Sequence, residues 1–351
     1  MTPNVVYVLG AGFSAPLGLP VMSNFLLLSK DLYFSKPAEY RYFADVFHQI
    51  AEMSSLKNYY RADLYNIEEI LSILEMQSFV GGDTLAEGFR RYISATIEAY
   101  TPPMQPYPGP LPSNWHRHLF GSLKWAPYGY FVADLCNLIV SKADHGSGKP
   151  LRHEVNLQPA ASYSVVTLNY DRVLETVCEY LSEHSFGSTE VRFQRAGQSN
   201  AAGLARLVKL HGDLDPTTIV PPTWNKGTHA HVIPEWSTAL RLLQEANYIR
   251  ILGYSLPESD EYVRYLLKSA AIKAPHLKGI DVLCMDPTGQ VRMRYDKFIE
   301  FNYYRFVNAR IEAFFDQYMS LLPTGIQPTA KWYDRLEEAH EQFFAAANAR
   351  T

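Results

Sequence analysis

Polar residues follow two apolar runs of the sequence and are of the types that act on hydroxyl groups. Asn169 and Asp171 come directly after the β-branched run 163–168, and His211 follows the apolar run 204–210. A histidine has an ordinary pKa near 6.5, so its neutral imidazole can serve as a general base, a role worth about 10²–10⁴ in rate. An asparagine can hold hydroxyls or a water without adding charge. These residue types are suited to positioning a hydroxyl and removing its proton.

A glycine-rich turn near the N-terminus is a candidate phosphate site. The apolar run 5–9 predicts a buried strand and stops at Gly10 and Gly12, with Phe13 and the small Ala15 behind them in a helix-compatible stretch. Such glycines permit a tight turn and let the backbone approach a pyrophosphate, while amides at the helix start face the anion. The alternative is a strand-to-helix turn that needs glycines only for its own geometry.

Two further apolar runs end in small or polar residues. Residues 248–252 lead into Gly253 and Ser255, and residues 280–285 lead into Asp286. Ligands of open α/β sheets gather outside the carboxyl ends of the strands, so these positions are expected on the same edge as the glycine turn. At any single position, ordinary loop and capping chemistry is the alternative. We expect an α/β fold, a Rossmann-like parallel sheet with helices on both faces and a large helical insertion.

The helical insertion is predicted from the residues that come after the glycine turn. An acidic strand end, expected about 20 residues later in a dehydrogenase-type fold, is missing, and residues 40–140 read almost entirely as helix. The small polar stretch 141–150 is the best linker candidate. The expected division is residues 1–35 and 151–325 for the sheet domain, 36–150 for the helical insertion, and 326–351 for a C-terminal helix.

The composition of the chain excludes several classes of protein. The 351 residues are 47% hydrophobic, enough for a large core, and the net charge of −4 with interspersed signs provides no basic stripe for direct nucleic-acid binding. Cys136, Cys178 and Cys284 are isolated in apolar runs, which favours buried thiols and no zinc site. No apolar window reaches the length of a membrane span. We expect a soluble, cytoplasmic protein that needs no metal.

Four sequence blocks together resemble successive motifs of the sirtuin superfamily, most closely its bacterial branch of NAD-hydrolysing antiphage defence proteins. The blocks are G-A-G-F-S followed by G-L-P, then T-L-N-Y-D, K-L-H-G-D and G-Y-S-L-P-E-S-D. They occur in the family order and, with Asp286, span most of the chain. The resemblance leaves the helical insertion and the tail after about residue 295 poorly covered.

The resemblance implies a role for each matching residue. Asn169 matches the asparagine near the nicotinamide ribose that can orient a water, Asp171 matches the acid that supports it, and His211 matches the general base on the ribose hydroxyl. Asp286 falls where the family contacts the adenosine ribose with an asparagine. The implied NAD⁺ contacts are Gly10, Ala11, Gly12, Phe13 and Ser14 for the pyrophosphate and adjoining ribose, and Gly253 and Ser255 for the adenosine half.

The resemblance also implies an activity and its regulation. The leading expectation is hydrolysis of NAD⁺ to ADP-ribose and nicotinamide, as an NAD-depleting effector in abortive infection. Alternatives are an NAD- or ADP-ribose-binding regulatory subunit, ADP-ribosyl transfer, or deacylation. Deacylation is disfavoured because the sequence has no C-x-x-C pair and has residues 21–25, V-M-S-N-F, where deacylases continue with Asp-Phe-Arg. Expected partners are further copies of the chain and a HerA-type ring ATPase or a short Argonaute.

Overall fold

A computed structural model of the chain describes residues 2–60, 63–82, 85–143, 149–198, 204–220, 232–322 and 334–348. Its centre is a six-stranded sheet in which every neighbouring pair is parallel. In spatial order the strands are β6 (Arg206–Lys209), β4 (Ser162–Thr167), β1 (Asn4–Leu9), β7 (Tyr248–Leu252), β8 (Gly279–Leu283) and β9 (Tyr304–Val307). Taken in chain order, this is the 3-2-1-4-5-6 arrangement of a doubly wound dinucleotide-binding sheet. The predicted Rossmann-like parallel sheet is confirmed.

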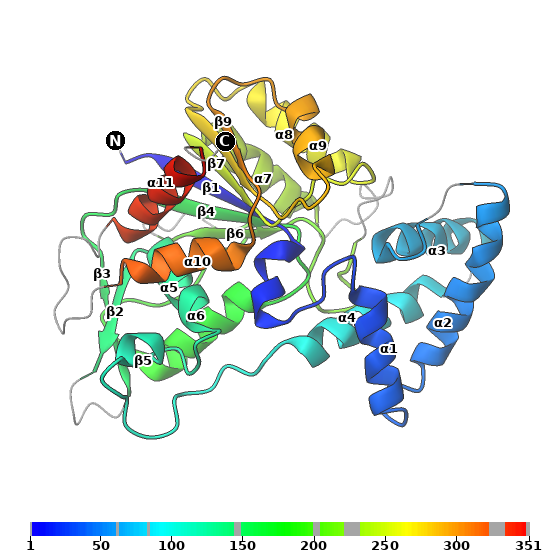
Figure 1. Cartoon of the computed structure of the whole chain (residues 1–351), viewed down its shortest axis with the longest axis horizontal. Helices are drawn as coiled ribbons and strands as arrows, with labels where there is room; N and C mark the ends of the chain where they lie inside the picture. The colour runs from blue at the N-terminus through cyan, green and yellow to red at the C-terminus, as the bar shows by residue number, and fades with distance from the viewer. Residues whose placement is uncertain are drawn as a thin grey trace.

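Helices cover both faces of this sheet, because its strands carry apolar side chains on both sides. In β1, Val6 and Val8 contribute to one core cluster, while Val5, Tyr7 and Leu9 contribute to the other. Figure 1 shows the two helical layers on either side of the strands. One layer holds α7 (Ile233–Glu245), α8 (Glu261–Ala271) and α9 (Gln290–Phe298), and the other holds α5 (Ala126–Leu135), α6 (Val173–His184), α10 (Ile311–Ser320) and α11 (Arg335–Asn348).

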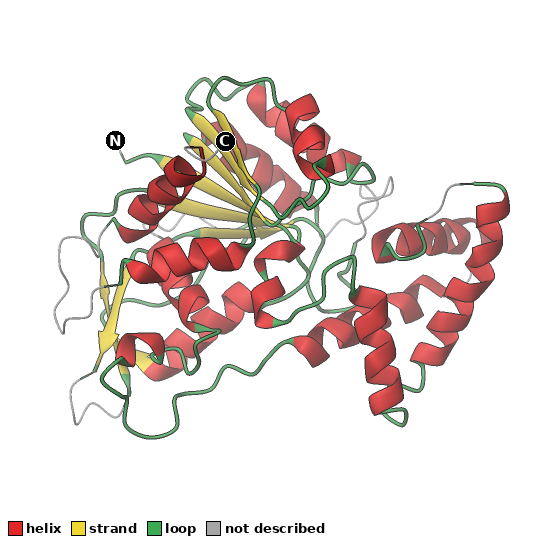
Figure 2. Cartoon of the chain, viewed as in Figure 1, coloured by secondary structure: helices red, strands yellow, loops and turns green. Residues whose placement is uncertain are grey.

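Four helices form a lobe beside the sheet. They are α1 (Phe25–Ser35), α2 (Phe43–Glu52), α3 (Ile67–Gly81) and α4 (Leu85–Tyr100). Helix α4 contacts each of the other three, and Figure 2 shows this part of the chain as helices and loops alone. The lobe therefore begins about ten residues earlier than the expected insertion. Within the described ranges no helix combines the length and apolar character that a membrane crossing requires.

The second half of the expected insertion belongs to the sheet domain. Helix α5 packs against β4 and α6, and the predicted helix over 115–140 gives way to a strand, β2 (Leu138–Lys142). Strand β2 pairs antiparallel with β3 (Leu151–Val155), which also pairs with the short β5 (Ser185–Phe186). A short apolar run can be helix or strand, and periodicity alone does not decide between them. The predicted linker at 141–150 thus joins two paired strands, and its residues 144–148 lie outside the described residues.

The C-terminal part differs from expectation in one strand. The sequence pattern predicted no strand near residue 304, yet β9 completes the sheet edge beside β8. The C-terminal helix predicted over 326–351 exists as α11, and α10 comes before it. Helix α11 begins at Arg335, and residues 323–333 of the expected 326–351 segment lie outside the described residues.

Candidate functional site

A cavity of about 670 Å³ lies at the carboxyl ends of the central strands. Strands β1 and β7 flank the point where the strand order reverses, which is where doubly wound sheets bind ligands. The lining also includes Ile67 and Glu68 from the start of α3, so the helical lobe forms one wall. Predicted site residues in the lining are Gly10, Ala11, Gly12, Asn169, Asp171, His211, Gly253 and Ser255.

The glycine turn is built differently from the expected strand-to-helix cradle. After β1 the chain makes two short 3-10 turns, Ala11–Phe13 and Ala15–Leu17, instead of starting an α-helix. The Gly12 amide donates to the Gly253 carbonyl at 2.9 Å. A Cβ on Gly10 would lie 2.6 Å from Tyr254 Cα, and one on Gly12 would lie 2.9 Å from Gly253 Cα. These glycines therefore allow the loops after β1 and β7 to pack together, and the Gly12 amide is already used in that contact.

Two residues of the G-A-G-F-S block, Phe13 and Ser14, are buried and are not in the described lining, so their contact with NAD⁺ stays a prediction. Phe13 is 1% exposed, and its ring packs against Tyr128 at 5.3 Å between centroids. Ser14 is equally buried and accepts a hydrogen bond from Asn169 Nδ2 at 3.3 Å. The apolar Phe13 side chain is used in the core, and the Ser14 hydroxyl supports the residue that faces the cavity.

Asn169 and Asp171 are held at the end of β4 by bonds to the glycine turn and to α6. The Asn169 amide nitrogen also donates to the Gly10 carbonyl at 3.1 Å, and its backbone amide donates to Thr167 Oγ1. Asp171 accepts from the Val173 amide at 3.1 Å, at the start of α6. Burial raises the pKa of Asp171, against the opposing effect of the Lys209 ammonium. The predicted proximity of Asn169 and the glycine turn is thus present in the structure.

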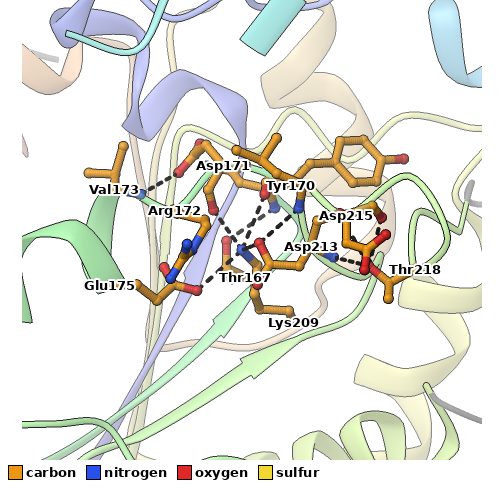
Figure 3. Close-up of polar contacts among 12 residues, drawn as sticks. Thr167, Tyr170, Asp171, Arg172, Val173, Glu175, Lys209, Asp213, Asp215 and Thr218 are labelled. Atoms are coloured by element: carbon orange, nitrogen blue, oxygen red, sulfur yellow. Dashed lines mark hydrogen bonds and ion pairs between the residues drawn. The ribbon is translucent and has the colours of Figure 1, made fainter. Parts of the chain in front are cut away.

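The Lys209 ammonium bonds both the loop that follows β4 and the loop that follows β6 (Figure 3). Its side chain is 4% exposed, and its ammonium donates to the Asp171 carbonyl at 2.6 Å and to Asp213 Oδ1 at 3.0 Å. The same ammonium contacts Glu175 Oε1 at 3.3 Å and the Tyr170 carbonyl at 3.2 Å. A single buried cation therefore fixes the loop carrying Asp171 relative to the loop that begins at His211.

His211 lies between two carboxylates from different parts of the chain. The residue is 2% exposed, with Nδ1 at 3.9 Å from Glu68 Oε1 and Nε2 at 3.7 Å from Asp260 Oδ2. The Tyr170 ring lies at 6.1 Å from the imidazole, centroid to centroid. His211, Glu68, Asp260 and Tyr170 all line the cavity. The imidazole is therefore buried in the protein yet available to a molecule in the cavity.

Gly253 follows β7 and lines the cavity, whereas Asp286 follows β8 and is not in the described lining. Gly253 has φ of 67°, a left-handed value that favours glycine, and a Cβ there would lie 2.3 Å from the Phe13 nitrogen. Asp286 is not among the described residues of the lining and accepts instead from the Arg292 amide at 2.8 Å. Its burial acts against ionisation, but amides at the start of α9 lower its pKa. The ribose contact of Asp286 stays a prediction, and its neighbours Met285 and Pro287 line the cavity.

Several lining residues had no role in the sequence prediction. Asp260 closes the G-Y-S-L-P-E-S-D block, so it lay within a quoted motif. Lys209, which opens K-L-H-G-D, is not in the described lining but bonds the Asp171 carbonyl. Glu68 gave no signal, because the helical pattern around it marked only the apolar neighbours that fill the core. Arg310, at the start of α10, also lines the cavity. Only the folded chain shows that these residues share one site.

Comparison with known proteins identifies a domain in the middle of the chain. Residues 163–288 match the family model described as a SIR2-like domain. This segment runs from β4 to just beyond β8 and carries Asn169, Asp171 and His211. None of the curated proteins matches the chain.

Three solved structures are similar at 12% sequence identity over 90% of this chain. A Sir2 in complex with the inhibitor EX-527, 2′-O-acetyl-ADP-ribose and deacetylated p53 peptide has a TM-score of 0.35 and is covered over 93%. Sir2Tm bound to a propionylated peptide has a TM-score of 0.35, and a Sir2 with p53 peptide and NAD⁺ one of 0.32, each covered over 92%. Similarities this weak carry no argument about ligands. Residues 163–288 of the chain therefore form a SIR2-like domain.

Proposed function

We propose that the chain is an NAD⁺ glycohydrolase that cleaves NAD⁺ to ADP-ribose and nicotinamide. The observation that carries the proposal is the meeting of Asn169 and His211, from two separate strand ends, in one cavity with the glycine turn. A pure nucleotide-binding site needs the turn but no base. The cavity volume of about 670 Å³ lies within the usual range for small-molecule sites, about 300–1,000 Å³.

One wall of the cavity suits the anionic part of a dinucleotide, whereas the carboxylates of the described lining are Glu68, Asp171, Asp260 and Glu312. Arg310 is the one lysine or arginine among the described residues of the lining. It directly precedes α10, whose first residue Ile311 also lines the cavity, so a cation and a helix N-terminus lie at the same wall. This wall suits the diphosphate of NAD⁺. Asn169 and His211 then remain for the nicotinamide ribose.

The chemistry needs few groups. The bond between the ribose C1′ and nicotinamide breaks with its electron pair on the nicotinamide, which leaves neutral, so little acid catalysis is required. Oxocarbenium character builds at C1′ and water adds there; the proton of the water goes to the ribose alkoxide, and the His211 imidazolium releases the net proton to solvent. In this proposal His211 takes a proton from a ribose hydroxyl, and Asn169 orients the hydroxyl or the water. The Ser14 and Gly10 contacts hold the Asn169 amide in place for that role.

The wider role is proposed from the motif resemblance. We propose an NAD-depleting effector of antiphage defence in the cytoplasm, held in a homo-oligomer or by a partner such as a HerA-type ATPase or a short Argonaute. Hydrolysis takes precedence over deacylation because the sequence has no C-x-x-C pair, so the cysteine pairs of the deacylase zinc module are missing.

Nicotinamide release from NAD⁺ tests the proposal. We expect Asn169→Ala and His211→Ala each to lose about 10² or more in turnover, the usual contribution of a positioned base or its partner, while thermal unfolding stays near wild type. His48→Ala, with a side chain 75% exposed on α2, is the matched control and should keep full activity. Near-normal release from both site variants contradicts the proposal, and NAD⁺ binding without any release supports a binding subunit instead.

A further inference from the structure

The helical lobe supplies an acidic side chain to the site. In an inference that rests on the proposed function, we propose that Glu68 is a positioning residue for His211: its carboxylate stabilises the imidazolium that forms when His211 accepts a proton from the substrate. The lobe is then a part of the catalytic site as well as a wall of the cavity. The start of α3 lies at the cavity, and His211 lies between the carboxylates of Glu68 and Asp260. The nearby cations Lys209 and Arg90 pair with Asp213 and Glu75.

The start of α3 is held firmly against the cavity. Asn66 caps the helix, its Oδ1 accepting from the amides of Glu68 at 3.0 Å and Glu69 at 3.1 Å. Ile67 is 5% exposed and Ile70 is 1% exposed, so the first turn is anchored by core packing. The Glu68 side chain is 14% exposed and lines the cavity. Its carboxylate is therefore delivered to His211 by a fixed element.

The two carboxylates face different nitrogens of His211. Glu68 Oε1 lies 3.9 Å from Nδ1, and Asp260 Oδ2 lies 3.7 Å from Nε2. Asp260 is 1% exposed and accepts from the Tyr254 hydroxyl at 2.8 Å, which fixes its orientation. Both distances are those of ion pairs and longer than hydrogen bonds. The arrangement stabilises a positive charge on the ring.

The other charged groups near His211 do not cancel the stabilisation of its imidazolium by Glu68. Lys209 directs its ammonium to Asp213 Oδ1 at 3.0 Å and to the Asp171 carbonyl at 2.6 Å. Arg90, on α4, pairs with Glu75 of α3. Burial, and next the charges of Glu68 and Asp260, raise the pKa of Tyr170, so this hydroxyl stays neutral beside His211.

The proton balance is simple. The proton leaves a ribose hydroxyl of NAD⁺ for a ring nitrogen of His211, which creates an alkoxide and an imidazolium. Glu68 exchanges no proton in this step. An opposite charge within about 4–6 Å favours the charged form of a titrating group. Removing the Glu68 charge should therefore make protonation of His211 harder, so its titration moves to lower pH.

The experiment compares Glu68→Gln with Glu69→Gln, a neighbouring charge in the same helical turn that is not in the described lining. We expect Glu68→Gln to lower kcat about tenfold with KM within about twofold, and to move the acidic limb of the pH–rate profile down by about one unit. Glu68→Asp, which keeps the charge, should recover most of kcat. Glu69→Gln should match wild type.

NMR titration of the His211 imidazole provides a readout that does not depend on turnover. We expect the midpoint to fall by about one pH unit in Glu68→Gln and to stay in place in Glu69→Gln. An unchanged midpoint in Glu68→Gln overturns the inference, as does a loss of kcat shared equally by Glu69→Gln. If the wild-type chain releases no nicotinamide, the proposed function fails, while the titration still decides whether Glu68 acts on His211.

Discussion

Two buried histidines, His211 and His340, each lie beside an aspartate, but in very different surroundings. His340 of α11 is 0% exposed, and its Nε2 lies 2.8 Å from Asp281 Oδ2 on β8. Its ring stacks on Phe344 at 4.5 Å between centroids. His211 has longer contacts of 3.7 and 3.9 Å to two carboxylates and lines the cavity. One histidine is closed within the core, while the other is open to a ligand.

The difference lies in what else the aspartate binds. Arg305 donates to both oxygens of Asp281, at 2.6 and 2.7 Å, and also to Glu341. Burial opposes ionisation of Asp281, but the Arg305 and His340 hydrogen bonds outweigh it and lower the pKa to about 2. Burial lowers the pKa of His340 to about 4, so its ring is neutral at pH 7, and we assign the ionised state of Asp281 mainly to Arg305.

This comparison shows that a buried histidine beside an aspartate is not by itself a catalytic signature. Asp281, His340 and Glu341 even lie close enough together to be metal ligands, yet Arg305 already bonds both carboxylates. The His340 group joins α11 to the sheet. The His211 group faces a cavity instead, where a substrate can meet the ring.

The largest expected effect separates the two histidines by function. His211→Ala should lose about 10²–10⁴ in nicotinamide release, because it removes the proposed base. His340→Ala should keep activity per folded molecule within about twofold but lose about 2–4 kcal/mol of unfolding free energy, since it leaves a core cavity and a lost hydrogen bond. Urea unfolding and turnover, measured on both variants, test the contrast. Comparable activity losses in the two variants would remove the distinction.

A smaller effect is expected when the cation of the His340 group is removed. Arg305→Met leaves Asp281 buried without its main partner and should cost about 2–3 kcal/mol of unfolding free energy, the lower range for a broken buried pair because Arg305 is 27% exposed. Glu341→Gln is the control. Its side chain is 57% exposed, so its loss should stay below about 1 kcal/mol. Equal losses from the two variants would show that Asp281 is not the partner that matters.

The smallest of the three effects concerns pH. The pKa of His340 is lowered from 6.5 to about 4 in the folded chain, so the unfolded chain binds this proton first as the pH falls. The stability contributed by the neutral ring is therefore present above about pH 6.5 and is lost as the pH falls toward 4, with about 2 kcal/mol gone by pH 5. Urea unfolding at pH 7 and pH 5 measures it. His340→Gln should lack this part of the pH dependence, and an unchanged slope in that variant argues against the assignment.

Most strands of the sheet could be predicted from apolar runs in the sequence. The runs 163–168 and 248–252 correspond closely to β4 and β7, because a strand buried on both faces appears as a continuous apolar stretch. The polar residues after these runs were placed correctly at one edge, since the strands of a parallel sheet share their carboxyl ends. Strand β2 was missed because its apolar residues continue a helical pattern.

Only some residues of the candidate site could be predicted from the sequence. Asn169 and His211 could be named because each follows a strand, but Phe13 and Asp286 follow strands too, and they are buried outside the described lining. Spacing along the chain gives the edge of the sheet on which a residue lies. It does not give the direction of a side chain, which depends on packing against distant segments such as α5 and α9.

By itself, the sequence determined the doubly wound class, the strand ends that bear Asn169 and His211, and the position of the glycine turn. All three depend on neighbours within a few residues, where hydrophobic periodicity and backbone geometry act. Only the tertiary structure decided that Glu68 of the helical lobe reaches His211, that the glycines serve loop packing, and that Arg305 closes off the second histidine. Those outcomes are set by contacts between residues far apart in the chain, because the energies that position a charge depend on what surrounds it in space.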